Sequence, residues 1–214
     1  MTFKIIIVED HPLMQKGMEM TLQAEADFEV VGIASSAEEA IGMVEEKRPD
    51  LAIIDISLPG MSGLELIRNL RSQFTGLKAL VVSRHEEELF AERAIRAGAQ
   101  GYMMKMHAGD QVVEAVRRIA DGGLYLSEKI SNRLLMGLSL GHDASSASPS
   151  DALSDRELQV FRLIGEGKST RTIAERMHIS TKTVDTYKTR IREKLHINDR
   201  STLLQQAVQW VKEL

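Results

Sequence analysis

Short runs of apolar residues alternate with amphipathic stretches over the first 125 residues of the chain. The apolar runs that predict strands are residues 4–8, 29–34, 51–54, 78–83 and 101–104. Apolar residues recur at helical spacing near residues 12–25, 36–47, 63–72, 86–97 and 109–121. Strands that are apolar throughout, such as IIIV and LAII, are typical of a sheet buried on both faces. The alternation therefore predicts an α/β domain with a parallel sheet between layers of helices.

Polar residues at the start of several amphipathic stretches agree with helix boundaries. Ser36 with Glu39, and Ser62 with Glu65, match the capping-box pattern. Pro12 fits a first helical position.

The pattern changes after residue 121. Residues 122–152 read as a linker that could carry a short helix at 127–137, because residues 138–152 are rich in Ser, Ala, Gly and Asp. From residue 153 the pattern is helical throughout. It predicts helices at 154–164, 170–177, 181–195 and 200–211. The second and third of these meet through a tight turn, which is typical of a helix-turn-helix. We therefore divide the chain into domains at 1–121 and 153–214.

Composition narrows the cellular setting. Cysteine is absent from the sequence, which excludes disulfides and thiolate zinc sites. No apolar run approaches the roughly 20 residues that a membrane helix needs. The N-terminus also lacks the long apolar region of a signal peptide. We expect a soluble, cytoplasmic protein without a membrane partner.

Charge is divided unequally along the chain. Residues 151–214 hold 12 Lys and Arg against 9 Asp and Glu, a net charge of +3, whereas residues 1–150 hold 15 against 22, a net charge of −7. This asymmetry favours two modules with different partners. The charge of the second module permits nucleic-acid binding without predicting it.

Five polar residues follow the predicted strands of the first domain. Glu9 and Asp10 follow the first strand, Asp55 the third and Lys105 the fifth, and Ser83 ends the fourth. Each alone would be an ordinary cap or surface residue, but parallel strands bring their carboxyl ends to one edge of the sheet. Clustered carboxylates need a cation. The set predicts a Mg²⁺ site around one aspartate that can take a phosphoryl group as an acyl phosphate.

With these strand-end residues, residues 1–121 resemble the receiver domains of bacterial two-component response regulators. The matching stretches are VEDHPL (8–13), DISLPGMSGLEL (55–66), VVS (81–83) and GYMMK (101–105). The resemblance implies a flavodoxin-like sheet of five parallel strands in the order 2-1-3-4-5.

The same resemblance implies a role for each matching residue. Asp55 accepts the phosphoryl group, and the metal is held by Glu9, Asp10, Asp55 and the backbone carbonyl of Ser57. Lys105 binds the phosphoryl oxygens, Ser83 is the switch hydroxyl, and Tyr102 is the aromatic switch.

Three positions depart from the usual pattern of the family. Glu9 replaces a common aspartate, Met106 replaces a common proline after the lysine, and Arg84 replaces a small residue. The resemblance places Ser57, Arg84 and His85 where receivers tune hydrolysis of the acyl phosphate, and the lifetime of that state stays open.

In the second domain, residues 153–210 resemble the LuxR-type helix-turn-helix, so the whole chain resembles a NarL/FixJ-type response regulator. The third helix has one apolar stripe and an opposite polar face that suits the major groove. The residues expected to contact DNA are Lys182, Asp185, Thr186, Lys188, Thr189, Arg190 and Arg192. Asp185, Thr186 and Thr189 fall at base-reading positions, and Asp185 stands where lysine is frequent.

The last helix carries apolar residues that could pair two modules or fill the core of one. They are Leu203, Leu204, Ala207 and Val208. The resemblance implies a homodimer, formed on phosphorylation or on DNA, that reads an inverted repeat in double-stranded DNA.

The leading hypothesis is a DNA-binding transcription regulator that a sensor histidine kinase phosphorylates on Asp55, and that is not otherwise an enzyme. A receiver that works through protein contacts without phosphorylation is the second hypothesis. An aspartyl-phosphate hydrolase is the third, although such enzymes carry an acid where this chain has Ser57. A regulator that senses a small molecule is the fourth, and residues 1–121 leave no room for a separate ligand domain.

Overall fold

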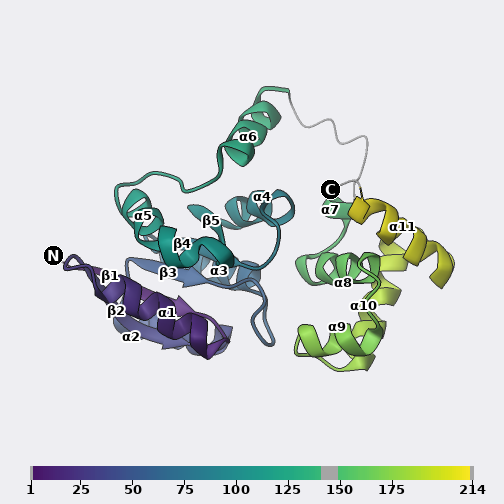
Figure 1. Ribbon diagram of the computed structural model, residues 1–214, viewed down its shortest axis with the longest axis horizontal. Coiled ribbons are helices and arrows are strands. Elements are labelled where there is room, and N and C mark those ends of the chain that lie inside the picture. The colour runs from purple at the N-terminus through teal and green to yellow at the C-terminus, as the bar shows by residue number, and fades with distance from the viewer. Residues whose placement is uncertain (1, 141–148, 213–214) are drawn as a thin grey trace. The chain divides into compact units, whose positions relative to one another are not determined.

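A computed structural model describes residues 2–140 and 149–212 of the chain (Figure 1). The chain divides into two compact units, Met1–Leu140 and Gly141–Leu214.

The first unit is built on a parallel sheet in the order β2-β1-β3-β4-β5. Its strands are β1 (Phe3–Val8), β2 (Phe28–Ala34), β3 (Leu51–Ile54), β4 (Lys78–Ser83) and β5 (Gly101–Met104). Every residue of β3 is buried, as expected for an apolar strand covered on both faces. The α/β class and the strand order are as predicted.

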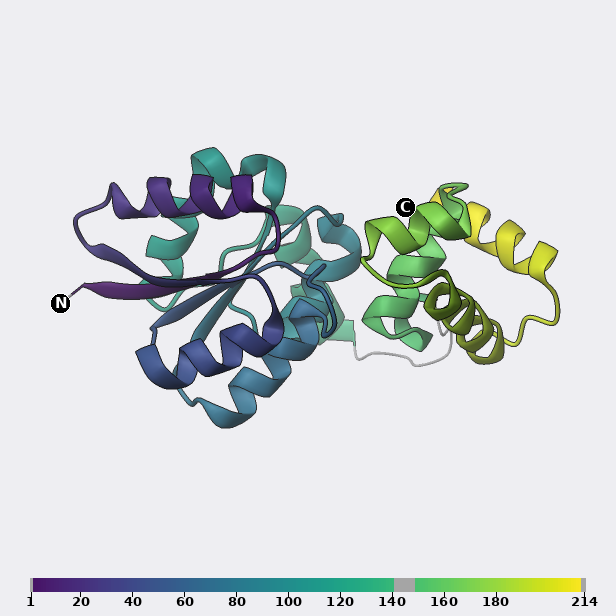
Figure 2. The same ribbon diagram turned by 90° about the horizontal axis from the view of Figure 1, so that it is seen from below.

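Helices cover both faces of this sheet (Figure 2). They are α1 (Pro12–Gln23), α2 (Ala37–Lys47), α3 (Gly63–Gln73), α4 (Glu87–Ala97) and α5 (Ala108–Ala120), with a short 3-10 helix η1 (Lys105–His107) before α5. A core of buried apolar side chains joins the sheet to α1 and α5, and includes Ile7, Ile53, Leu22 and Val112. The packing fixes the strand ends, from which the site residues project.

Serine caps follow the sequence pattern, although Ser62 Oγ accepts from the Glu65 N–H at 3.2 Å without the return bond of a full capping box. The capping box at Ser154 and Glu157 has both of its reciprocal hydrogen bonds. Ser36 Oγ accepts from the backbone N–H of Glu39 at 3.2 Å, but the Glu39 carboxylate accepts from the N–H of Ser35 at 2.8 Å. The return bond is therefore displaced by one residue.

The helix α6 (Glu128–Leu140) belongs to the first unit and packs on α4. It covers the range where the predicted linker could carry a short helix and extends beyond it. Ile130 of α6 is buried, with 2% of its surface exposed. Residues 141–148 of the predicted linker lie outside the described residues.

The second unit is helical. Its described helices are the single turn α7 (Pro149–Ala152), α8 (Asp155–Gly165), α9 (Thr170–Arg176), α10 (Thr181–Lys194) and α11 (Arg200–Lys212). Val184 and Ile191 of α10 are fully buried, and the ring of Trp210 lies 5.4 Å from that of Phe161. None of the helices described in either unit is long and apolar enough to cross a membrane.

Candidate functional site

The carboxyl ends of β1, β3 and β5 bring an acidic cluster and a lysine together. Lys105 Nζ lies 2.8 Å from Asp55 Oδ2 and 2.6 Å from Glu9 Oε2. Glu9 and Asp55 are almost fully buried, with 1% and 2% of their surfaces exposed. Buried carboxylates need a cationic partner. The single positive charge of Lys105 does not balance the three carboxyl groups of Glu9, Asp10 and Asp55.

His11 belongs to this cluster, and sequence reasoning did not single it out. Its Nδ1 lies 2.8 Å from Glu9 Oε1 and 2.7 Å from Asp10 Oδ1. His11 occupies the N-cap position of α1 with an extended backbone. The position of His11 directly after Glu9 and Asp10 could have indicated that it belongs to the cluster. The direction of its ring, however, depends on how α1 begins.

The cluster fits a metal ion. Ligand atoms of Glu9, Asp10, His11 and Asp55 all lie within 4.8 Å of one another. Oxygens bound to one ion at about 2.1 Å stand at most about 4.2 Å apart, so small shifts would suffice. Asp55 Oδ1 is buried and has no hydrogen-bond partner among the described residues. A buried oxygen in that state is suited to a cation. The acidic cluster is typical of a Mg²⁺ site.

His85 connects the other predicted residues of the first unit. Ser83 is fully buried, and its Oγ accepts from the backbone N–H of His85 at 3.3 Å. Ser57 Oγ lies 2.8 Å from His85 Nε2. The hydroxyl of the buried Tyr102 donates to the carbonyl of His85 at 2.8 Å. Arg84 is exposed. The sequence predicted His85 only as a residue that tunes hydrolysis of the acyl phosphate. The hydrogen bonds of its backbone N–H and carbonyl do not depend on its side chain, so residue type gave no indication of them.

Gly63 packs against the backbone of Asp55, and a side chain at Gly63 should destabilise the fold. A Cβ on Gly63 would lie 2.0 Å from the backbone oxygen of Asp55. We expect Gly63→Ala to lower the free energy of unfolding by about 1–3 kcal/mol, measured by urea denaturation followed by circular dichroism. The matched control is Gly17→Ala in α1, where nothing lies within 4 Å. The control should raise stability by about 0.5–1 kcal/mol, and equal effects of the two would contradict the packing argument.

The outer face of α10 carries most of the residues predicted to contact DNA. Five of them are exposed: Lys182, Asp185, Thr186, Thr189 and Arg190. Lys188 and Arg192 are half-buried at the edges of this face.

Local bonds orient several of these side chains. Lys188 Nζ donates to Thr170 Oγ1 at the start of α9 and lies 3.8 Å from Asp185 Oδ1. The hydroxyl of Thr189 donates to the carbonyl of Asp185 at 3.1 Å, and Thr186 makes the same bond to Lys182. Because these hydroxyl protons are used within the helix, both threonines present a methyl group and an acceptor oxygen.

The four apolar residues predicted for pairing on α11 are divided between core and surface. Leu203 and Ala207 are buried in the unit itself, with 3% and 0% of their surfaces exposed. Leu204 is 47% exposed and Val208 is half-buried. Only the last two present surface that a second module could cover.

Acid should weaken the second unit through Glu157. Burial raises the pKa of Glu157, but hydrogen bonds from Lys194 Nζ and the Ser154 N–H, both 2.7 Å long, hold that pKa below its usual 4.5. This stabilisation is therefore complete above the unfolded pKa and is lost as the pH falls through the folded one. We expect Glu157→Gln to lower the free energy of unfolding at pH 7 by about 1 kcal/mol and to flatten its decline with acid. Fluorescence of the single tryptophan, Trp210, measures both effects, and identical acid profiles would refute the assignment.

Comparisons with known proteins agree with both units. Residues 5–117 match the response regulator receiver domain, and residues 151–207 match the luxR family of bacterial regulatory proteins. The transcriptional regulatory protein DegU of Brevibacillus brevis is 32% identical over 98% of this chain and 95% of its own length. The oxygen regulatory protein NreC of Staphylococcus carnosus is 34% identical over 96% of each chain.

A solved structure of similar extent is RcsB from Salmonella enterica serovar Typhimurium, bound to promoter P1flhDC in the presence of the phosphomimetic BeF3−. It is 25% identical, with a TM-score of 0.59 over 99% of this chain and 100% of that one. The curated relatives are regulatory proteins rather than conventional enzymes. The chain thus belongs to the response regulators that join a receiver domain to a LuxR-type DNA-binding region.

Proposed function

We propose that this chain regulates transcription by binding DNA, and that phosphorylation of Asp55 controls this binding. The observation that carries the proposal is the buried Asp55 beside Lys105 and the acid pair, in a chain that also holds a helix-turn-helix. The promoter-bound relative, solved with a phosphoryl mimic, supports the link between the two. The proposed domains are 1–121 and 153–214, with 122–152 between them.

The chemistry follows from the residues around Asp55. A carboxylate oxygen of Asp55 attacks the phosphorus of a phosphohistidine on a sensor kinase, so that a P–O bond forms as the P–N bond breaks. Lys105 is close enough to Asp55 to hold an oxygen of the transferred group. Mg²⁺, held by Glu9, Asp10, Asp55 and the carbonyl of Ser57, would neutralise the charge of the phosphoryl oxygens.

The residues around His85 control the conformational switch and the hydrolysis of phosphorylated Asp55. Ser83 is the hydroxyl that turns toward the phosphoryl group, and Tyr102 follows it. Ser57, Arg84 and His85 control the approach of hydrolytic water. The hydrogen bond between Ser57 and His85 supports this role, because it holds both side chains in one place.

In the second unit, α10 enters the major groove. Base contacts come from Asp185, Thr186 and Thr189, and a carboxylate at Asp185 favours cytosine through its N4 amino group. The basic residues of the face, Lys182, Lys188, Arg190 and Arg192, contact phosphates. Leu204 and Val208 provide the accessible part of a dimer contact, which favours an inverted repeat.

Selection of genomic DNA fragments by the purified chain, with and without beryllofluoride and Mg²⁺, tests the proposal. We expect a set of fragments that share an inverted repeat and are enriched when beryllofluoride is present. If the same fragments bind equally well in both conditions, the receiver works through protein contacts alone and phosphorylation is not the switch.

A further inference from the structure

His11 offers a nitrogen ligand to a site whose other potential ligands are carboxylate oxygens. It stands at the N-cap position of α1, but its side chain makes no capping hydrogen bond. The half-buried ring instead turns toward the acid pair, with Nδ1 at 2.8 Å from Glu9 Oε1 and at 2.7 Å from Asp10 Oδ1. The imidazole therefore faces the oxygens that are proposed to hold the cation.

The separations between these atoms suit a single ion. Two ligands bound at about 2.1 Å stand about 3.0 Å apart at a right angle and about 3.4 Å apart at the tetrahedral angle. The distances from His11 Nδ1 to the two oxygens lie just below these values. The ligand atoms of all four residues lie within 4.8 Å of one another, so their separations would change by no more than about 1.5 Å around a tetrahedral ion.

Asp55 completes the set with an oxygen that Lys105 does not use. Lys105 Nζ contacts Asp55 Oδ2 at 2.8 Å. Asp55 Oδ1 is buried and has no hydrogen-bond partner among the described residues, so it is the oxygen suited to a metal. Glu9, Asp10, His11 and Asp55 can thus each supply one ligand while Asp55 keeps its contact with the lysine.

A nitrogen ligand changes which ion such a site prefers. Mg²⁺ favours oxygen ligands in an octahedral arrangement and keeps several of its waters. Imidazole favours Zn²⁺ and other transition metals, and Zn²⁺ accepts a tetrahedral set of histidine and carboxylate ligands. One histidine and three carboxylates fill that set without any cysteine.

The two ions leave the site in different chemical states. An octahedral Mg²⁺ has positions left for water and for an oxygen of a phosphoryl group. A tetrahedral Zn²⁺ with four protein ligands has no open position, as in structural zinc sites. Zinc would also occupy Asp55 Oδ1 while Lys105 contacts Oδ2, so neither oxygen of the carboxylate could attack phosphorus.

We propose that Glu9, Asp10, His11 and Asp55 form a zinc site, and that zinc holds the receiver in a form that cannot be phosphorylated. The inhibition rests on the proposed function, because Asp55 is the proposed acceptor. Mg²⁺ and Zn²⁺ compete for the same carboxylates, so the ratio of the two ions sets the fraction of the protein that can accept a phosphoryl group.

His11→Asn in the full chain separates the two ions. Asparagine is a favourable N-cap residue, and its side chain offers a hard oxygen in place of the imidazole nitrogen. We expect the affinity for Zn²⁺, measured by calorimetry, to fall at least about tenfold. The affinity for Mg²⁺, measured from amide chemical shifts, should change less than about threefold.

The matched control is His196→Asn in the second unit. His196 has a left-handed backbone with φ of 54°, which asparagine tolerates. This variant should bind both ions as the parent does. Equal affinity for Zn²⁺ in the His11 variant and the parent would refute His11 as a ligand.

Cobalt reports the geometry of the site in the parent chain, without any substitution. Tetrahedral Co²⁺ absorbs visible light far more strongly than octahedral Co²⁺. We expect intense bands from the parent with Co²⁺, which disappear when Zn²⁺ is added, and weak bands from the His11 variant. The weak spectrum of octahedral cobalt in the parent would overturn the closed tetrahedral site.

Labelling by acetyl phosphate distinguishes failure of this inference from failure of the proposed function. The parent should be labelled with Mg²⁺ alone, and micromolar Zn²⁺ in the same reaction should reduce the label toward background. The His11 variant should keep most of its label with Zn²⁺ present. Full labelling of a parent chain that has bound zinc would overturn the inhibition and leave the proposed function intact. Absence of label with Mg²⁺ alone would instead refute the proposed function, and the inhibition with it.

Discussion

Replacement of Asp55 by alanine should abolish phosphorylation of the chain by acetyl phosphate and Mg²⁺. Asp55 is the buried carboxylate that Lys105 contacts, and its second oxygen has no hydrogen-bond partner among the described residues. Removal of the nucleophile leaves no route to the acyl phosphate, so incorporation of label should fall by at least about 100-fold. Radiolabelled acetyl phosphate, with acid-stable and base-labile phosphate counted separately, measures this loss.

The matched control is Asp50→Ala, at the opposite end of β3. Asp50 Oδ2 accepts from the backbone N–H of Lys4 at 2.8 Å and is remote from the carboxyl edge of the sheet. The Asp50 variant should be labelled as the parent is. If the Asp55 variant retains the parent's base-labile label, Asp55 is not the acceptor.

Charge reversal at Arg190 should nearly eliminate specific DNA binding. Arg190 is exposed on the face of α10 that is proposed to enter the groove. Arg190→Glu removes one phosphate contact from each module and adds a repulsion, so a dimer should lose affinity on the order of 100-fold at physiological salt. The slope of log affinity against log salt should also become shallower. Fluorescence anisotropy with a selected fragment, over a series of salt concentrations, measures both quantities.

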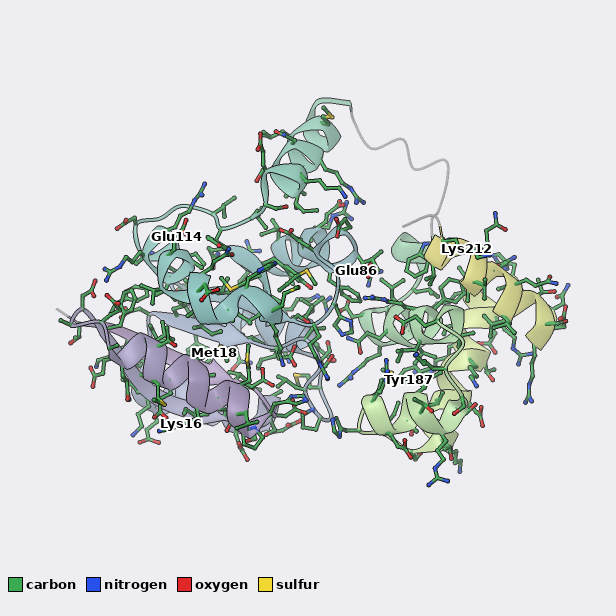
Figure 3. All side chains as sticks on the ribbon, viewed as in Figure 1. Lys16, Met18, Glu86, Glu114, Tyr187 and Lys212 are labelled. Carbon is green, nitrogen blue, oxygen red and sulfur yellow. The ribbon has the colours of Figure 1, made fainter. Side chains whose placement is uncertain are left out.

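Lys212→Glu is the matched control for this change. Lys212 is exposed at the end of α11 (Figure 3), and its reversal alters the net charge of the unit by the same amount. A general effect of charge would weaken binding equally in both variants. A loss confined to the Arg190 variant would place the contact on α10, whereas equal losses would contradict the proposed groove face.

Much of the first unit could be predicted because its signals are local. Continuous apolar runs fixed the strands, and parallel topology then placed Asp55 and Lys105 at one edge although 50 positions separate them. The apolar stripe of α10 likewise predicted which face of the helix is exposed, and the stripe residues Val184 and Ile191 are buried as expected.

Contacts between polar residues could not be predicted in this way. Residues 122–152 were predicted as a linker that could carry a short helix at 127–137. The contacts of Lys129 and Arg133 with glutamates of α4 could not be predicted, because no hydrophobic period indicates them. The bond between Ser57 and His85 likewise depends on where two loops meet in space. On α11, sequence spacing grouped Leu203 with Leu204, and only the packing separated the buried residue from the exposed one.

The contacts of Lys105 affect how the site would respond to a divalent cation and to a phosphoryl group. Lys105 places its single positive charge against Glu9 Oε2 and Asp55 Oδ2, so a divalent cation bound by these carboxylates would share them with the ammonium. A phosphoryl group offers the ammonium a new anionic partner and leaves the carboxylates to the cation. Phosphorylation of Asp55, as proposed, would therefore raise the affinity of the site for the divalent cation.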